Sequence, residues 1–313
     1  MKRNAKSALS IFAASAVLAL TLAGCGGGNN ASTDTSAPAD NSGSEASTTA
    51  VVSGTVSTNG STSMEKVIGS LKEQFQKDND GKVTVSYDAT GSGAGIEAVS
   101  NGTTDIGLSS RALKDEETSA GLTGTTVALD GIAVIVNADS QVSDLSVEQI
   151  GQIFSGQITN WKEVGGDDAK IVVLNRKAGS GTRATFEAAV FGDEAVDFKG
   201  DAELDKSGDV QTQMGSTDNA ISYLDFSHFD DSKFNAIKVE GVEPKSANVT
   251  DDSFKIWATE HMYCAKDADE ATKAFLEFML SDDVQGKLVE EQGFIPVSAM
   301  KVVKDASGKV SAK

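Results

Sequence analysis

Apolar residues in this chain recur at two spacings from about residue 51 onward. Runs rich in valine, such as VTVSY at 83–87, predict buried strands, whereas the spacing of Val67, Leu71 and Phe75 predicts one face of a helix. Strands that alternate with helices predict a parallel sheet with helices on its faces. The elements that we expect in this part of the chain are strands at 51–58, 82–88 and 105–110 and helices at 61–77 and 94–101.

The later part of the chain continues the alternation and predicts a second lobe. Residues 129–137 form a long apolar run that suits a crossover strand, and 256–258 and 262–264 look like returning strands. About 260 residues follow position 50, which favours two α/β lobes joined by two crossovers, with a single doubly wound enzyme domain as the alternative. The expected domains are a first lobe at 51–133, a second lobe at 134–258, and at 259–313 the return to the first lobe with a polar C-terminal tail.

Three turns rich in glycine and serine each precede a predicted helix, and the central one lies in IVVLNRKAGSGTRATFE at 171–187. A strand, a Gly/Ser turn and a helix in this order point backbone N–H groups and the positive end of the helix dipole at an anion. Arg176 and Arg183 add guanidinium groups suited to oxyanions. A plain helix cap is the alternative for one such turn. Three of them, the others at 60–63 and 91–95, predict one anion held by several helix starts.

The first 50 residues have the features of an export signal and a tether. Lys2, Arg3 and Lys6 precede an apolar run that ends in Leu-Ala-Gly-Cys at Cys25, which resembles the lipobox of bacterial lipoproteins. We therefore expect a signal peptide at 1–24, a lipid on Cys25, and a flexible tether at 25–50, which is Gly/Ser/Thr-rich. A transmembrane helix is the alternative for the apolar run. A lipidated Cys25 leaves Cys264 as a lone thiol.

The charge of the chain limits the kinds of partner that it is expected to bind. Its formal net charge is −19, and removal of 1–24 leaves 24 basic and 46 acidic residues, a net charge of −22. Such acidity disfavours nucleic acid and anionic membranes as partners. A local cleft of N–H and O–H dipoles can still bind an anion, since surface charges are screened within roughly 8 Å at physiological salt.

Catalytic and cofactor motifs are missing from the sequence. It has no GxxxxGK[ST], no GxGxxG and no GxSxG, and neither His228 nor His261 stands at convincing metal-ligand spacing from a second ligand. We therefore expect no enzyme activity, no cofactor and no metal. Donors without an evident base or nucleophile predict a protein that binds its ligand unchanged.

Several of these motifs together resemble the phosphate-binding lipoproteins (PstS family) of bacterial ABC phosphate importers. They are STS at 61–63, GSGAG at 91–95, DIGLSSR at 105–111, ITNW at 158–161 and RKAGSGTR at 176–183, and the last is the most specific. The resemblance covers essentially 51–300. It implies the type II periplasmic-binding-protein fold, with two α/β lobes and phosphate in the cleft between them.

The resemblance also implies the ligand contacts. Thr62 and Ser63, with Ser61 beside them, match donors of the first lobe, and Ser92 matches a hydroxyl donor of the second Gly/Ser turn. Arg176 matches the phosphate-contacting arginine. The helix N-terminal donors match Ser180, Gly181 and Thr182.

The chain departs from the family at one position. Where members with the best-described site have an aspartate that accepts the proton of hydrogen phosphate and so rejects sulfate, this chain has Ser110, followed by Arg111. We expect both Ser110 and Arg111 among the phosphate-binding residues. Asp130 is the substitute acceptor that we consider, and a structural turn or an ion pair with Arg111 is the equal alternative.

The sequence thus predicts an extracytoplasmic, lipid-anchored, monomeric receptor that binds inorganic phosphate and delivers it to ABC permease subunits in the cell membrane. The alternatives are a receptor for sulfate, molybdate or another oxyanion, a secreted phosphatase or phosphotransferase with Ser180 or Thr182 as nucleophile, or a surface interaction protein that has lost the site.

Overall fold

The computed structural model describes residues 52–192, 194, 196, 198, 200–230, 232–304 and 309–313. These residues belong to a single compact unit, 49–313. The predicted signal peptide, Cys25 and the predicted tether lie outside the described residues. Within the described ranges, no helix combines the length and the apolar character that crossing a membrane requires.

The first part of the unit alternates strands and helices as the sequence predicts. Helix α1 buries Val67, Leu71 and Phe75, the residues whose spacing identified it. The elements are β1 (Gly54–Gly60), α1 (Glu65–Asp78), β2 (Val83–Ala89), α2 (Ser92–Ser100), β3 (Ile106–Ser109), the 3-10 helix η1 (Asp115–Ala120) and β4 (Thr123–Asn137).

The second part begins after β4. Its elements are β5 (Asp144–Leu145), α3 (Val147–Phe154), η2 (Trp161–Val164), β6 (Val172–Arg176), α4 (Gly181–Phe191), β7 (Ala202–Leu204), α5 (Ser207–Met214), β8 (Ala220–Asp225), η3 (Phe226–His228), β9 (Phe234–Ala236), β10 (Lys238–Val239) and α6 (Ser246–Thr250). The chain then returns through β11 (Trp257–Cys264), α7 (Glu270–Met279), the π-helical turn η4 (Val284–Leu288), α8 (Val289–Glu291), η5 (Val297–Ala299), β12 (Val302–Lys304) and β13 (Val310–Ala312).

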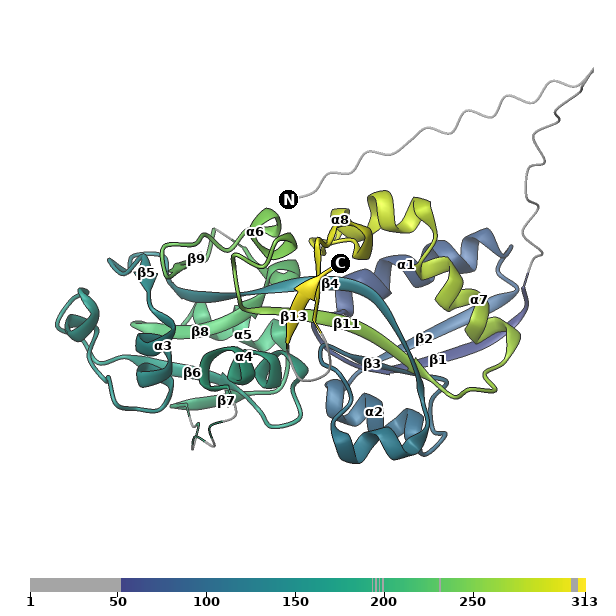
Figure 1. Ribbon diagram of the computed structural model, residues 1–313, viewed down its shortest axis with the longest axis horizontal. Coiled ribbons are helices and arrows are strands. Elements are labelled where there is room, and N and C mark those ends of the chain that lie inside the picture. The colour runs from purple at the N-terminus through teal and green to yellow at the C-terminus, as the bar shows by residue number, and fades with distance from the viewer. Residues whose placement is uncertain are drawn as a thin grey trace, which may run out of the picture. The chain divides into compact units, whose positions relative to one another are not determined.

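Two long strands join the halves of one sheet, whose order is β2-β1-β3-β11-β4-β8-β6-β7 with β9 beside β4. The outer pairs β1–β2, β1–β3, β6–β8 and β6–β7 are parallel, whereas β11 and β4 pair antiparallel with each other and with their neighbours. Figure 1 shows β4 and β11 running from the β1–β3 side to the β6–β8 side. They are the two crossovers that the sequence predicts.

Each half of the sheet has its own apolar core and helices on both faces. In the first half, α1 and α7 share one core with β1–β3, while Ile96 and Val99 of α2 pack with Tyr263 of β11. In the second half, α3 and α4 pack on one face through Phe154 and Phe186, and α5 packs in another cluster. This arrangement confirms the two-lobed α/β architecture.

The differences from the predicted elements fall where polar residues hide a strand or interrupt a helix. Strand β4 begins at Thr123, six residues before the apolar run, and β11 is one continuous strand through Thr259–His261. The helix expected over 271–291 is broken after Met279, where Ser281-Asp282-Asp283 follows.

The C-terminal segment also differs from the expectation that 259–313 belongs to the first lobe and ends in a loose tail. Ile295 and Met300 join the core of the second half, with Val302 and Val310 packed against it, and β12 pairs antiparallel with β13. The exact lobe boundaries stay a prediction.

Candidate functional site

Three serine hydroxyls meet at the carboxyl ends of β1 and β3. The Oγ of Ser61 lies 2.8 Å from that of Ser63 and 2.5 Å from that of Ser110, and Ser63 and Ser110 are 2.6 Å apart. All three residues are buried. We call Ser61, Ser63 and Ser110 the serine cluster. Ser110 lies 49 residues after Ser61 in the sequence, and the parallel pairing of β1 with β3 brings the two together.

A glycine allows this approach. Gly60 has a φ of +138°, and a Cβ at this position would overlap the carbonyl of Leu108 in β3. The tight passage lets the Ser61 amide donate to the Leu108 carbonyl at 2.9 Å, which aligns the two strand ends. From the neighbouring helix start, the Oγ of Ser92 accepts the Ser110 amide at 3.1 Å. The Gly/Ser turns at 60–63 and 91–95 therefore lie close together, as predicted.

The second half contributes a buried guanidinium. Arg176, at the end of β6, donates through Nη1 to the Oγ of Ser207 at 3.1 Å, and through Nη2 to Thr62 Oγ1 at 3.0 Å and the Asp205 carbonyl at 2.9 Å. Its Nε is buried and has no hydrogen-bond partner among the described residues. Burial lowers the pKa of Arg176, while Asp225 acts in the opposite direction. A desolvated arginine whose Nε–H has no partner suits an anionic ligand.

Helix α4 starts beside this arginine. Its first N–H groups have no acceptor within the helix, so the positive end of the α4 dipole adds to the arginine charge. Gly181 is required at this start, because a Cβ there would overlap the Oγ of Ser92 across the cleft. Ser180 caps the helix by accepting the Arg183 amide at 3.2 Å, which is the plain role considered for it.

Contacts between the two halves close this region. The Gly93 amide donates to the Gly179 carbonyl at 3.0 Å, and the Thr185 hydroxyl donates to the Ser110 carbonyl at 2.9 Å. The Thr62–Arg176 bond also joins the two sides. The three Gly/Ser turns thus meet between the two halves, as the sequence predicts, and we call the region where they meet the cleft.

Three carboxylates lie behind the cleft. Asp130 on β4, Asp225 on β8 and Glu260 on β11 are fully buried, and they offer oxygens within 4.8 Å of one another. We call these three the acid cluster. Asp225 accepts from Thr182 at 3.0 Å and from Ser207 at 3.0 Å, whereas Glu260 accepts from Ser110 at 2.8 Å and Ser63 at 3.3 Å.

Burial and the crowding of negative charge raise the pKa of Glu260 and of Asp130. Burial, followed by repulsion from Asp225, raises the pKa of Glu260 well above its ordinary value. Burial, followed by repulsion from Asp225 and Glu260, raises the pKa of Asp130 in the same way. Protons are therefore retained in the acid cluster at pH values where exposed carboxyls are ionised.

Asp130 lies in this cluster, but its contacts differ from the predicted ones. Its Oδ1 accepts the Ser227 amide at 3.4 Å, and its Oδ2 is buried with no partner among the described residues. The alternative ion pair with Arg111 is wrong, because the Arg111 guanidinium is bound to both oxygens of Glu117 at 2.7 and 2.8 Å. Arg111 also donates to the Ala112 carbonyl and has no recorded bond to the serine cluster.

The sequence analysis missed Glu260, Asp225 and Ser207. Asp225 is the last residue of the buried strand β8, and strand ends identified the other candidates, so its signal was available. Glu260 had none, because it lies in a polar stretch that separated two predicted strands. A bulge between Glu260 and His261 shifts the register against β4 there, and bulges commonly redirect side chains.

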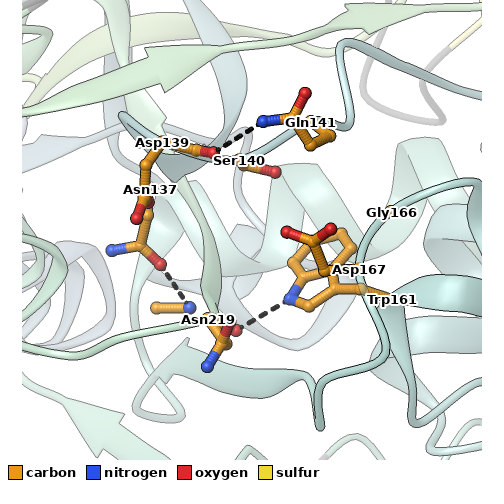
Figure 2. Close-up of a pocket in the computed structure, with 9 residues that line it drawn as sticks. Asn137, Asp139, Ser140, Gln141, Trp161, Gly166, Asp167 and Asn219 are labelled. Carbon is orange, nitrogen blue, oxygen red and sulfur yellow. Dashed lines mark hydrogen bonds between the residues drawn. The ribbon is translucent and has the colours of Figure 1, made fainter.

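A small pocket of about 50 Å³ in the second half lies apart from this cleft (Figure 2). Figure 2 shows the Trp161 indole N–H, which donates to the Asn219 carbonyl at 3.0 Å. Trp161 is otherwise part of the apolar core. The ITNW motif is thus structural, and the pocket shares no residue with the serine or acid cluster.

Comparison with known proteins gives consistent matches. A family model described as a PBP superfamily domain matches residues 43–283. The phosphate-binding protein PstS of Bacillus subtilis is 39% identical over 261 residues, covering 83% of this chain and 86% of the relative. PstS of Borreliella burgdorferi is 29% identical, covering 77% of this chain and 90% of the relative.

Solved structures agree with these matches. A phosphate ABC transporter substrate-binding protein of Clostridium perfringens, with bound phosphate, is 39% identical with a TM-score of 0.75, covering 78% of this chain and all of that one. An ABC-type phosphate transport receptor from Vibrio cholerae is 33% identical with a TM-score of 0.65, covering 77% and 99%. This chain belongs to the PstS family of the PBP superfamily, with its two-lobed fold.

Proposed function

We propose that this protein is a receptor that captures inorganic phosphate in the cleft between its lobes and delivers it to the permease subunits of an ABC importer. The observation that carries the proposal is the buried Arg176, whose Nε has no partner among the described residues and which lies beside the α4 N-terminus and the serine cluster. Phosphate presents several oxygen acceptors to such donors, and hinge motion of the lobes would admit and release it.

The proposed ligand contacts fall into three groups. Arg176 and the N–H groups of Gly181 and Thr182 bind the anion from the second lobe, with Ser180 holding the helix start. The serine cluster, Thr62 and Ser92 line the first lobe. Asp130 stays our sequence-based candidate for the acceptor of the ligand proton, with Ser110 as the alternative acceptor, and Arg111 stays a proposed neighbour of the site.

The test is calorimetric titration of the full chain in mild detergent, first with phosphate and then with sulfate and molybdate. Tight phosphate binding supports the proposal. A preference for sulfate or molybdate would instead favour the other oxyanion receptors, a possibility that the serine at position 110 keeps open. Lack of response to all three anions would contradict the proposal.

We also propose that the protein is a binder without catalytic activity. The Thr182 hydroxyl donates to the buried Asp225 carboxylate, a pairing that a general base could use, so the point needs an assay. Asp225 also accepts from Ser207. This second bond fits a structural role for Asp225 better than the role of a general base. Hydrolysis of a chromogenic phosphate ester, abolished by Thr182→Val, would contradict this proposal.

The proposed location is outside the cytoplasm, with a monomeric body anchored to the cell membrane through a lipid on Cys25. Cys25→Ser should release the protein from the membrane fraction without changing phosphate affinity. A variant that still sediments with membranes would exclude the lipid anchor. Sedimentation of the purified chain at several concentrations tests the monomer.

A further inference from the structure

The Ser110 hydroxyl has more neighbours than it has hydrogens. Its Oγ lies 2.5 Å from Ser61 Oγ, 2.6 Å from Ser63 Oγ and 2.8 Å from Glu260 Oε2. A hydroxyl has one hydrogen, and an ionised carboxylate can only accept. When Glu260 is ionised, Ser110 therefore donates its one hydrogen to Glu260, and towards every other neighbour the Ser110 oxygen can only accept.

Glu260 is better placed than Asp130 to control the cleft. Glu260 contacts two members of the serine cluster, through Oε2 to Ser110 and through Oε1 to Ser63 at 3.3 Å. The recorded bond of Asp130 is to the Ser227 backbone. Glu260 reaches this place from β11, where the bulge follows it.

We infer that Glu260 fixes the direction of the Ser110 hydroxyl and thereby makes the cleft prefer a protonated oxyanion, hydrogen phosphate, over one without a proton, such as sulfate. The inference rests on the proposed phosphate-binding function and names a positioning residue that acts through Ser110. Hydrogen phosphate donates its P–OH to the Ser110 oxygen. Sulfate has no hydrogen to donate, so one of its oxygens meets a lone pair in a dry site, which is unfavourable.

The charges around Glu260 make this preference depend on pH. The carboxylates of Asp130 and Asp225 face it from β4 and β8, and the Tyr87 hydroxyl interacts with it electrostatically. Arg176 is the cation that lies near Asp225. Because burial and Asp225 raise the pKa of Glu260, the carboxylate becomes protonated at a higher pH than an exposed carboxyl does. Protonated Glu260 donates to Ser110, whose own hydrogen is then free for the ligand.

The direction in which sulfate affinity changes with pH follows from the protonation state of Glu260. Above the raised pKa, Glu260 is ionised and Ser110 accepts, so sulfate is rejected. Below it, Ser110 donates and sulfate binding improves. Sulfate is a useful probe because its own charge does not change over this range, whereas that of phosphate does.

Two variants of the full chain in detergent test the inference by calorimetry with phosphate and sulfate. Glu260→Met removes the acceptor, so the ratio of phosphate to sulfate affinity should fall about tenfold or more. Glu260→Gln cannot titrate whichever way its amide turns, so the rise in sulfate affinity that the parent shows as the pH is lowered should disappear. Glu260→Gln also keeps the test valid if Glu260→Met does not fold.

Matched variants separate this role from a general effect of charge or packing. Asp252→Asn removes one mostly buried carboxylate that accepts from Trp257 and pairs with Lys255 outside the cleft, and it should leave the ratio unchanged. In a Ser110→Ala background, Glu260→Met should have no further effect on the ratio, because the hydroxyl that Glu260 orients is gone.

Four results would overturn the inference. The first is an unchanged ratio of phosphate to sulfate affinity in a folded Glu260→Met, and the second is a sulfate pH profile in Glu260→Gln that matches the parent. The third is loss of selectivity in Asp130→Asn but not in Glu260→Met. The fourth is parent selectivity that disappears with a chelator and returns with a divalent cation. A parent that binds no phosphate at all contradicts the proposed function instead, so the two failures are distinguishable.

Discussion

The two walls of the proposed phosphate site offer an anion different groups. The first-lobe wall offers the neutral hydroxyls of the serine cluster, and Glu260 lies behind them. The second-lobe wall offers the Arg176 charge and the α4 N-terminus, and Asp225 lies behind them through Ser207 and Thr182. Charge on one wall supplies attraction to any oxyanion, whereas hydroxyls whose direction is set by a carboxylate can distinguish one oxyanion from another. The difference assigns affinity mainly to the second lobe and selectivity mainly to the first.

The largest effect on phosphate affinity should come from removing the charge of Arg176. Arg176→Ala deletes a buried cation that donates to Ser207, Thr62 and the Asp205 carbonyl. Loss of a desolvated charge contact costs about 2–5 kcal/mol, so phosphate affinity should fall about 30-fold or more. Calorimetry with phosphate measures the loss.

Arg176→Lys is the matched variant, since it keeps the charge and loses the planar fork. It should bind phosphate more weakly than the parent and more tightly than Arg176→Ala. Affinity within threefold of the parent for Arg176→Ala would show that the second wall does not supply the attraction.

A smaller effect on phosphate affinity should follow from removing one hydroxyl of the serine cluster. Ser63→Ala removes a hydroxyl that contacts Ser61, Ser110 and Glu260, and about 1 kcal/mol per lost hydrogen bond predicts a roughly fivefold to tenfold loss of phosphate affinity. Ser222→Ala is the control, because Ser222 is equally buried but donates to the Leu174 carbonyl. Equal losses in both variants would show a packing effect and not a contact with the ligand.

The acid cluster behind the walls should affect stability as well as binding. Because the pKa of Asp130 is raised in the folded protein, the folded state holds a proton that the unfolded chain has released, and the free energy of unfolding falls as pH rises through this window. Asp130→Asn removes this cost and can donate to a neighbouring carboxylate. At neutral pH it should stabilise the protein without ligand by about 1 kcal/mol or more.

Below the ordinary aspartate pKa of about 3.9 the gain should vanish, since both states are then protonated. Denaturant unfolding at acidic and neutral pH measures the difference, with Asp252→Asn as the control outside the cluster. A gain that does not change with pH would mean that Asp130 is not a buried acid under strain from its neighbours.

The sequence predicted the charged wall more fully than the carboxylates behind the cleft. Local signals identified Arg176 and the three Gly/Ser turns, because a strand, a glycine turn and a helix start are adjacent in the chain. Glu260 is set by long-range pairing of β11 with β3 and β4 and by a bulge, neither of which leaves a local pattern. The same cause hid the first six residues of β4, whose polar composition conceals a strand that is paired on both edges of the crossover.

The smallest effect should come from Arg111, which tests how far the charged region of the cleft extends. Although Arg111 follows Ser110 directly, its guanidinium is bound to both oxygens of Glu117 and to the Ala112 carbonyl. The bidentate pair lowers the pKa of Glu117, as expected of a carboxylate beside a cation. Arg111→Ala should therefore change phosphate affinity about twofold at most, since a screened charge outside the contact shell contributes little.

Glu117→Gln frees the guanidinium and serves as the companion variant. If Arg111→Ala weakens binding tenfold while Glu117→Gln does not, Arg111 contacts the ligand and the first lobe also supplies attraction; equal small effects keep the attraction with Arg176 alone.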